Sequence, residues 1–195
     1  MLKSAFVIFV LCSAALAQSA KARENYDKAV KEVGRGGHLN KAEKLLKEAI
    51  ADSPTWALAY AELGDVYFYM PKEDPAVEAY TQARELDFKD HSLALDRRRV
   101  VNNNLAYVLA STKEYEKSIA VLEPSIKDDP EYGAYVYNLA CDYSEMGDLD
   151  KALTLLKHAW ELRDSFVFPN ILVDSSFGRW RNDPRFQQAT RAMVK

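Results

Sequence analysis

Two helical stripes of residues within 57–90 constrain the fold of the whole chain. Each stripe has the spacing of one face of an α-helix, and a segment with two prolines, residues 70–75, separates them. The first stripe consists of Tyr60, Leu63, Gly64 and Tyr67, and the second of Ala76, Tyr80 and Ala83. Gly64 and Ala76 are small enough for the two helices to approach closely, while the tyrosine rings fill the space around them. The stretch therefore predicts a helical hairpin, which cannot bury both of its apolar faces without neighbours.

The same pattern recurs in register along the chain, so the chain supplies these neighbours. The four copies span residues 23–56, 57–90, 99–132 and 133–166. The fourth copy carries the pattern as Val136, Leu139, Ala140, Tyr143, Ala152, Leu156 and Ala159. An insertion, residues 91–98, separates the second copy from the third. Four copies in register predict a stack of helical hairpins, each of which covers the apolar flank of the next.

These residues resemble the tetratricopeptide repeat, whose consensus places Trp, Leu, Gly and Tyr on the first helix and Ala, Phe, Ala and Pro on the second. The resemblance covers about four repeats within residues 18–166. It implies an all-α fold, an α-solenoid of helix hairpins wound as a right-handed superhelix.

Residues 167–195 are similar to the closing segment that follows the last repeat in many bacterial proteins of this family. Phe177, Trp180 and Phe186 are expected to cover the apolar flank of the last repeat, which has no following repeat to cover it. This interpretation makes residues 167–195 a C-terminal capping segment. The alternative is that these aromatic residues are exposed and dock a partner.

Residues 1–17 have the features of an export signal. Lys3 supplies a positive charge, residues 5–16 an apolar run, and residues 15–17 a small-residue cleavage site. The run is shorter than the roughly 20 apolar residues that a transmembrane helix needs. We therefore expect an exported protein, periplasmic or secreted, whose mature chain does not insert into a membrane; a lipoprotein and a retained anchor are the alternatives. Cleavage would leave Cys141 as the only cysteine, which excludes a disulfide framework.

The insertion 91–98 admits two interpretations. Asp90 or Ser92 could cap a helix that continues without a breaker, which would make the helix near 92–111 about two turns longer than its counterparts. Alternatively, the insertion lengthens only a loop.

The resemblance also implies which side chains face a binding groove. In tetratricopeptide repeats, four positions of the first helix line the concave surface, and their spacing places them on one stripe. The residues that we expect to contact a bound peptide are Leu58, Asp65, Phe68, Tyr69, Asn103, Tyr107 and Tyr137. Tyrosine supplies contact area and a hydroxyl, and the Asn103 amide can both donate to and accept from a peptide backbone. The alternative is that several of these rings only pack between repeats.

Charge and motifs weigh against nucleic-acid binding and catalysis. The chain has 26 basic and 29 acidic side chains and a net charge of −3, whereas phosphate recognition needs a clustered basic surface. The three arginines at 97–99 are a short run, typical of a solvated or salt-bridging helix face. The sequence also lacks the zinc-protease, P-loop, dinucleotide and nucleophile-elbow motifs. We therefore expect no enzyme activity, no metal and no cofactor.

The expected function is a binding or scaffolding module outside the cytoplasm that holds a protein or peptide partner in its groove. Related domains grip the C-terminal carboxylate of chaperone tails with basic and amide side chains. Here the corresponding places hold Asp27, Lys31, Asp65 and Val100, so such a tail is not the expected partner. The alternative is an accessory structural subunit of a cell-envelope assembly that uses its outer surface or the helix near 92–111. The repeat specifies a shape and not a ligand, so the sequence names neither the partner nor the oligomeric state.

Overall fold

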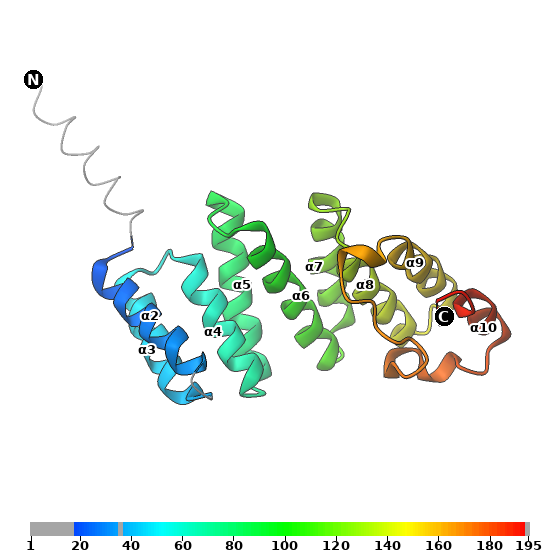
Figure 1. Cartoon of the computed structure of the whole chain (residues 1–195), viewed down its shortest axis with the longest axis horizontal. Coiled ribbons are helices and arrows are strands. Elements are labelled where there is room, and N and C mark those ends of the chain that lie inside the picture. The colour runs from blue at the N-terminus through cyan, green and yellow to red at the C-terminus, as the bar shows by residue number, and fades with distance from the viewer. Residues whose placement is uncertain (1–17, 35–36, 194–195) are drawn as a thin grey trace, which may run out of the picture. The chain divides into compact units, whose positions relative to one another are not determined.

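The computed structural model describes residues 18–34 and 37–193, and every regular element in these ranges is helical (Figure 1). The elements are α2 (Ala20–Gly34), α3 (Leu39–Asp52), α4 (Ala57–Tyr69), α5 (Glu73–Asp90), α6 (Leu95–Ser111), α7 (Tyr115–Asp128), α8 (Gly133–Met146), α9 (Leu149–Glu161), the 3-10 helices η1 (Arg163–Ser165) and η2 (Ser175–Trp180), and α10 (Pro184–Thr190). Within the described ranges, no helix is both long enough and apolar enough to cross a membrane. The predicted export signal, residues 1–17, lies outside the described residues.

Consecutive helices form antiparallel hairpins that pack on their neighbours. α2 packs on α3, α4 on α5 and α8 on α9, while α3 on α4 and α7 on α8 join one hairpin to the next. The turn inside each hairpin contains a residue with positive φ, at positions 37, 71, 113 and 147. The interval from the second of these turns to the third is longer than the other two intervals, and it is the one that contains residues 91–98. The predicted all-α fold of stacked hairpins is confirmed.

Gly64 allows α4 and α5 to approach closely. A Cβ atom at Gly64 would lie 2.5 to 2.9 Å from three ring carbons of Tyr80 on α5. Gly64, Tyr80 and Ala76 are all buried, and the Tyr80 hydroxyl donates a hydrogen bond of 2.6 Å to Asp65. The Tyr80 ring therefore occupies the space that a side chain at Gly64 would need.

Gly64→Ala tests this packing. Because the added methyl would overlap the Tyr80 ring, we expect the free energy of unfolding to fall by about 1–2 kcal/mol, overpacking outweighing the better helix propensity of alanine. Gly34→Ala is the matched control, since a Cβ there meets no atom within 4 Å. Urea unfolding followed by circular dichroism measures both. Equal stability of the two variants would contradict the packing argument.

The insertion 91–98 is divided between a link and a helix. α5 ends at Asp90, and α6 begins only at Leu95. The helix that the sequence placed near 92–111 therefore starts later than expected. The other expectation, a longer loop, accounts for residues 91–94.

Asp87 explains why the link is not helical. This buried carboxylate accepts a hydrogen bond of 2.7 Å from the backbone N–H of Leu93, and it forms an ion pair with Arg98. The Leu93 side chain is buried as well, and His91 ends α5 in the left-handed conformation. The chain is thus held in the link by a side-chain bond to its backbone, which competes with helix formation.

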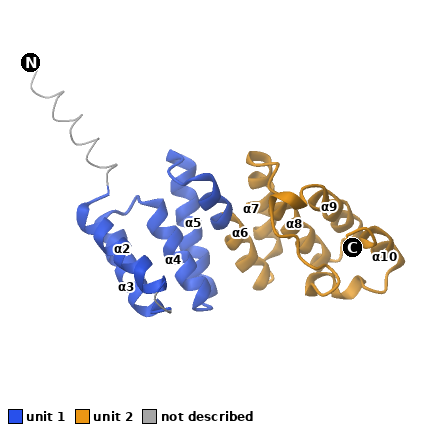
Figure 2. Cartoon of the chain, viewed as in Figure 1, with its two compact units in different colours: residues 1–101 blue, residues 102–195 orange. Residues whose placement is uncertain are grey.

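The chain divides into two compact units, residues 1–101 and 102–195, coloured separately in Figure 2. In unit 1, a small core of alanines from α2, α3 and α4 surrounds Trp56. The ring of Tyr26 lies 4.7 Å from the ring of Trp56, and Leu58 and Ile50 pack on the same core. α6 begins in unit 1 and ends in unit 2.

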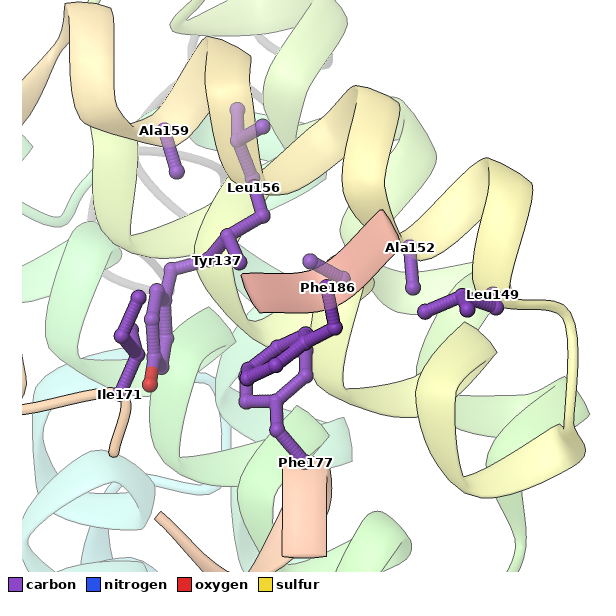
Figure 3. Close-up of a cluster of buried hydrophobic side chains, with 10 residues drawn as sticks. Tyr137, Leu149, Ala152, Leu156, Ala159, Ile171, Phe177 and Phe186 are labelled. Atoms are coloured by element: carbon purple, nitrogen blue, oxygen red, sulfur yellow. The ribbon is translucent and has the colours of Figure 1, made fainter. Parts of the chain in front are cut away.

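The core of unit 2 joins α8 and α9 to the residues that follow them. Phe177 and Phe186 are buried, with their rings stacked 5.6 Å apart, and Tyr137 lies beside Ile171 (Figure 3). Trp180 is half-buried, and its indole N–H donates to the Ser144 hydroxyl at 3.0 Å. Phe177 and Phe186 thus present almost no surface on which a partner could dock.

Candidate functional site

A pocket of about 580 Å³ in unit 2 is the candidate site. Its walls come from α6, the start of α7, α8 and residues 173–176. The lining residues are Ala106, Tyr107, Ala110, Ser111, Tyr115, Ser118, Tyr137, Asn138, Cys141, Asp142, Glu145, Val173, Asp174, Ser175 and Ser176. α6 and α8 are the first helices of their hairpins, which is where the resemblance placed the groove-lining positions.

Three of the predicted site residues lie at or near this pocket. Tyr107 lines it and is 57% exposed. Tyr137 also lines it but is only 4% exposed, and its hydroxyl donates a hydrogen bond of 2.6 Å to Asp174. Asn103 does not line the pocket; its amide oxygen accepts a hydrogen bond of 2.7 Å from Asn138, which does. Tyr107 is thus the predicted residue with the most surface to offer a ligand here.

The other four predicted residues lie in unit 1. Leu58 packs on the core around Trp56. Phe68 and Tyr69 meet edge to face with ring centres 5.8 Å apart, and Tyr69 is 64% exposed. A hollow of about 460 Å³ in this unit is lined by residues of α3 alone. As contacts for a ligand, these residues stay predictions.

Asp65 belongs to a charged cluster inside unit 1. Arg97 lies 2.6 Å from Asp65 and 3.2 Å from Glu62, and none of the three side chains is more than 24% exposed. Burial raises the pKa of the Glu62 carboxyl, against the opposing effect of the Arg97 charge. Because Tyr80 also donates to Asp65, the cluster ties the start of α6 to α4 and α5.

Arg97→Met tests how far this cluster holds α6 in place. The variant keeps much of the apolar stem but leaves two half-buried carboxylates without their cation, so we expect a loss of about 2–4 kcal/mol in unfolding free energy. Arg191→Met, at an exposed position, should change it by less than about 0.5 kcal/mol. Thermal and urea unfolding measure both variants. An unchanged stability of Arg97→Met would show that the cluster does not hold the helix.

Asp142 on α8 is an unusual pocket residue because its carboxylate is buried. The residue is 1% exposed, and its Oδ2 atom makes no hydrogen bond within the described part of the chain. Burial raises the pKa of Asp142 to about 7, and the neighbouring Ser118 hydroxyl opposes this only in part. A carboxylate can accept about four hydrogen bonds, so one serine cannot satisfy it.

The repeat register shows that Asp142 stands where the two preceding copies have an apolar residue. It is the tenth residue of its copy, and the same place holds the buried Val66 and Val108 in those copies, while the first copy has Glu32 there, paired with His38 and Lys41. Ser118 likewise occupies a place where the other copies have an alanine: Ala42, Ala76 and Ala152. Sequence reasoning missed this pair, although an aspartate aligned with two valines was a visible signal.

The pocket is acidic. Asp142, Glu145 and Asp174 line it, and no lysine, arginine or histidine is among the lining residues that the structure describes. Burial and nearby carboxylates raise the pKa of the Cys141 thiol well above its usual value. Cys141 therefore stays a neutral thiol at pH 7 and is not an activated nucleophile.

The wall formed by residues 173–176 is fixed by bonds to α8. Asp174 accepts from the Tyr137 hydroxyl, and its second oxygen accepts from the backbone N–H of Ser176 at 2.9 Å. The Ser144 hydroxyl donates to the carbonyl of Ser176 at 2.6 Å. The whole of α9 lies in the sequence between α8 and this wall, so no local pattern pointed to these bonds.

Asp142→Asn tests the buried carboxylate through pH. Its pKa is about 3.9 in the unfolded chain and about 7 in the folded one. The folded state therefore binds the extra proton between these values, and wild-type stability falls as pH rises from 4 to 7, by at most about 1.4 kcal/mol per pH unit. Asp142→Asn has no carboxyl group at this position and escapes this loss of stability. Its stability relative to wild type should therefore increase from pH 4 to 8.

Urea unfolding at several pH values measures this difference. The exposed Asp128→Asn is the control, and its curve should run parallel to that of wild type. If stability also changed with pH in the same way in Asp142→Asn and in wild type, folding would not raise the pKa of Asp142.

Comparisons with known proteins agree with the fold. A family model for the tetratricopeptide repeat matches residues 135–163, which contain most of α8 and α9. A crystal structure of MamA superposes with a TM-score of 0.64 at 22% sequence identity, over 73% of this chain and 78% of that one. MamA from Desulfovibrio magneticus RS-1, residue 41 to the end, superposes with a TM-score of 0.73 at 18% identity, over 91% and 95%. No curated protein matches the sequence.

At these identities the MamA structures show similarity of fold, whereas the family match rests on the sequence of the fourth copy itself. That copy contains Asp142 and both helices that build the unit 2 core. The fourth copy is thus a tetratricopeptide repeat by sequence, and the stacked helical hairpins of the described chain support the same repeat fold.

Proposed function

We propose that this protein is a non-enzymatic interaction scaffold that binds an extended segment of a protein partner in the pocket of unit 2. The observation that carries the proposal is the pocket itself, which lies on the first helices of the third and fourth hairpins and exposes Tyr107. An exposed tyrosine on a rigid helix supplies large contact area at low entropic cost, which is typical of residues that anchor a partner. Affinity should be modest, on the order of micromolar, because a flexible segment must be ordered on binding.

The described residues give no support to a catalytic alternative. No group of three or more histidine, cysteine, aspartate or glutamate side chains in the described ranges is placed to hold a metal ion. Among the pocket residues, Cys141 has a raised pKa, and Tyr137 has its hydroxyl committed to Asp174. The pocket is therefore better suited to holding a ligand than to transforming one.

The location of the protein outside the cytoplasm is part of the proposal. It rests on the charge, apolar run and small-residue site of residues 1–17. N-terminal sequencing of the protein recovered from each cell fraction tests it. We expect the mature chain to begin at Gln18 and to be found outside the cytoplasm; an intact N-terminus in the cytoplasmic fraction would refute this.

A second candidate function uses the outer surface, as an accessory subunit of a cell-envelope assembly. The observation in its favour is that α5 and the start of α6 carry exposed apolar side chains, Phe88 at 81% and Leu95 at 49%. The arginines at 97–99 do not contribute such a surface, because each forms an ion pair within the chain. Phe88 is thus the residue that distinguishes this candidate from pocket binding.

Paired substitutions of exposed aromatic residues test the two candidates. Random twelve-residue peptides displayed on phage are selected on the full chain, and the recovered peptides are then measured on the variants Tyr107→Ala and Phe88→Ala. If the pocket binds them, Tyr107→Ala should weaken binding about tenfold, equivalent to about 1.4 kcal/mol, and Phe88→Ala should not.

The reverse result would favour the outer surface. Circular dichroism of both variants serves as the control for folding, since both side chains are largely exposed and their removal should leave the helix content unchanged. If selection yields no peptide that depends on either residue, the scaffold function proposed for these surfaces is wrong.

A further inference from the structure

The acidic pocket of unit 2 has a property that a general peptide-binding surface does not need. Asp142 sits in its wall with 1% exposure and an Oδ2 atom that no described group bonds. A buried carboxylate with an unbonded oxygen is costly, and the valines at the same place in two other copies show that the fold does not require it. Its presence in a cavity wall points to a ligand that it faces.

The charges around Asp142 specify the sign of that ligand. Glu145 and Asp174 line the same pocket, and the described lining contains no basic side chain that would neutralise them. Asp174 is engaged by Tyr137 and Ser176, so Asp142 and Glu145 are the carboxylates left to meet a ligand. An anionic ligand would be repelled here, whereas a cation would be attracted through the low-dielectric wall without needing direct contact with Oδ2.

The aromatic lining favours an organic cation. Tyr107 and Tyr115 line the pocket together with the carboxylates and keep part of their surface exposed, whereas Tyr137 packs into the core. The faces of tyrosine rings attract ammonium and guanidinium groups, and their edges pack on the apolar stem of a long basic side chain. A pocket with both features matches lysine or arginine better than it matches a small inorganic ion.

We propose that this pocket holds a lysine or arginine side chain of the bound partner segment, with Asp142 as the counter-ion in the wall and Glu145 nearer the solvent. The inference rests on the proposed function and adds the chemistry of the partner to it. The polar pair at Ser118 and Asp142 is then a feature of recognition, since alanine stands at the place of Ser118 in the other three copies and valine at the place of Asp142 in the second and third. The first copy has Glu32 at the place of Asp142, but Glu32 is paired with His38 and Lys41 of its own hairpin.

A pH dependence of binding follows from this assignment. A bound cation stabilises the ionised carboxylate, so binding should strengthen as pH rises through 7, where Asp142 loses its proton in the free protein. Asp142 interacts with Ser118 and Tyr115 on α7 and with Cys141 beside it on α8. Tyr115 in turn interacts with Glu145 and Arg179, and Cys141 with Asp174 and Glu145. The pKa values of Tyr115 and Cys141 are raised, so both stay neutral across pH 6 to 8, whereas the pKa of Asp142 lies within that range.

Pools of synthetic peptides test the inference. Each heptapeptide is acetylated and amidated at its ends, randomised over uncharged residues, and carries one fixed central residue: lysine, arginine, glutamate or norleucine. Retention on the immobilised full chain is measured by mass spectrometry at pH 6 and pH 8. We expect lysine or arginine pools to be retained at least about fivefold more than norleucine pools at pH 8, with a smaller preference at pH 6.

The Asp142→Asn variant should remove both the preference and its pH dependence. Asp128→Asn, which removes the same charge from the exposed end of α7, should keep both. Glu145→Gln is the second test variant and should lower the preference, which keeps the inference testable if Asp142→Asn fails to fold. Circular dichroism reports the folding of each variant.

Four results would overturn the inference. Retention that ignores the charge of the central residue but still depends on Tyr107 would refute it and leave the proposed function standing. A preference for basic residues that survives in both Asp142→Asn and Glu145→Gln would place the cation elsewhere. Displacement of the peptides by equimolar spermidine or acetyl-lysine amide would identify a site for small amines instead of a partner segment. If the chain retained none of the peptide pools, the result would count against the proposed function as well.

Discussion

The structure depends on the burial of helix faces that a single hairpin cannot cover. Each pair of helices leaves an apolar flank, and the next pair supplies the surface that removes it from water. The small residues of the pattern set how close this packing becomes. At Gly64 the Tyr80 ring occupies the place of a side chain, so the helix spacing in that hairpin depends on the absence of one methyl group.

The same packing scheme determines what polar side chains can do. Val66 and Val108 fill this place with an apolar side chain in the second and third copies, and Glu32 in the first copy is paired with His38 and Lys41. Asp142 brings a carboxylate to the same place, with no basic side chain among the described residues that line its pocket. Burial then raises its pKa to about 7, and the pocket beside it becomes acidic. A scaffold built from similar units thus acquires a distinct site through two substitutions at fixed positions, one on each of two neighbouring hairpins.

Charged groups elsewhere in the chain have structural roles. Arg97 and Arg98 hold the start of α6 and the preceding link by pairing with Asp65 and Asp87, respectively. Asp65, which the sequence predicted to line the groove, is paired with Arg97 and accepts a hydrogen bond from Tyr80. An inward position on the first helix is therefore available to a ligand only where no neighbouring element supplies a partner for it.

The sequence by itself determined the helical hairpins, their regular period and the small residues between them, because helix periodicity and packing volume are local and recur in every copy. It predicted Tyr107 as an exposed inward residue, but it gave no means to separate Tyr107 from Tyr137, which points into the core. Only the tertiary structure decided the surroundings of Tyr137, Asp65 and Asp142. Their partners come from other helices or from the residues after α9. The exposure, hydrogen bonds and pKa of a side chain depend on all the groups that surround it in space.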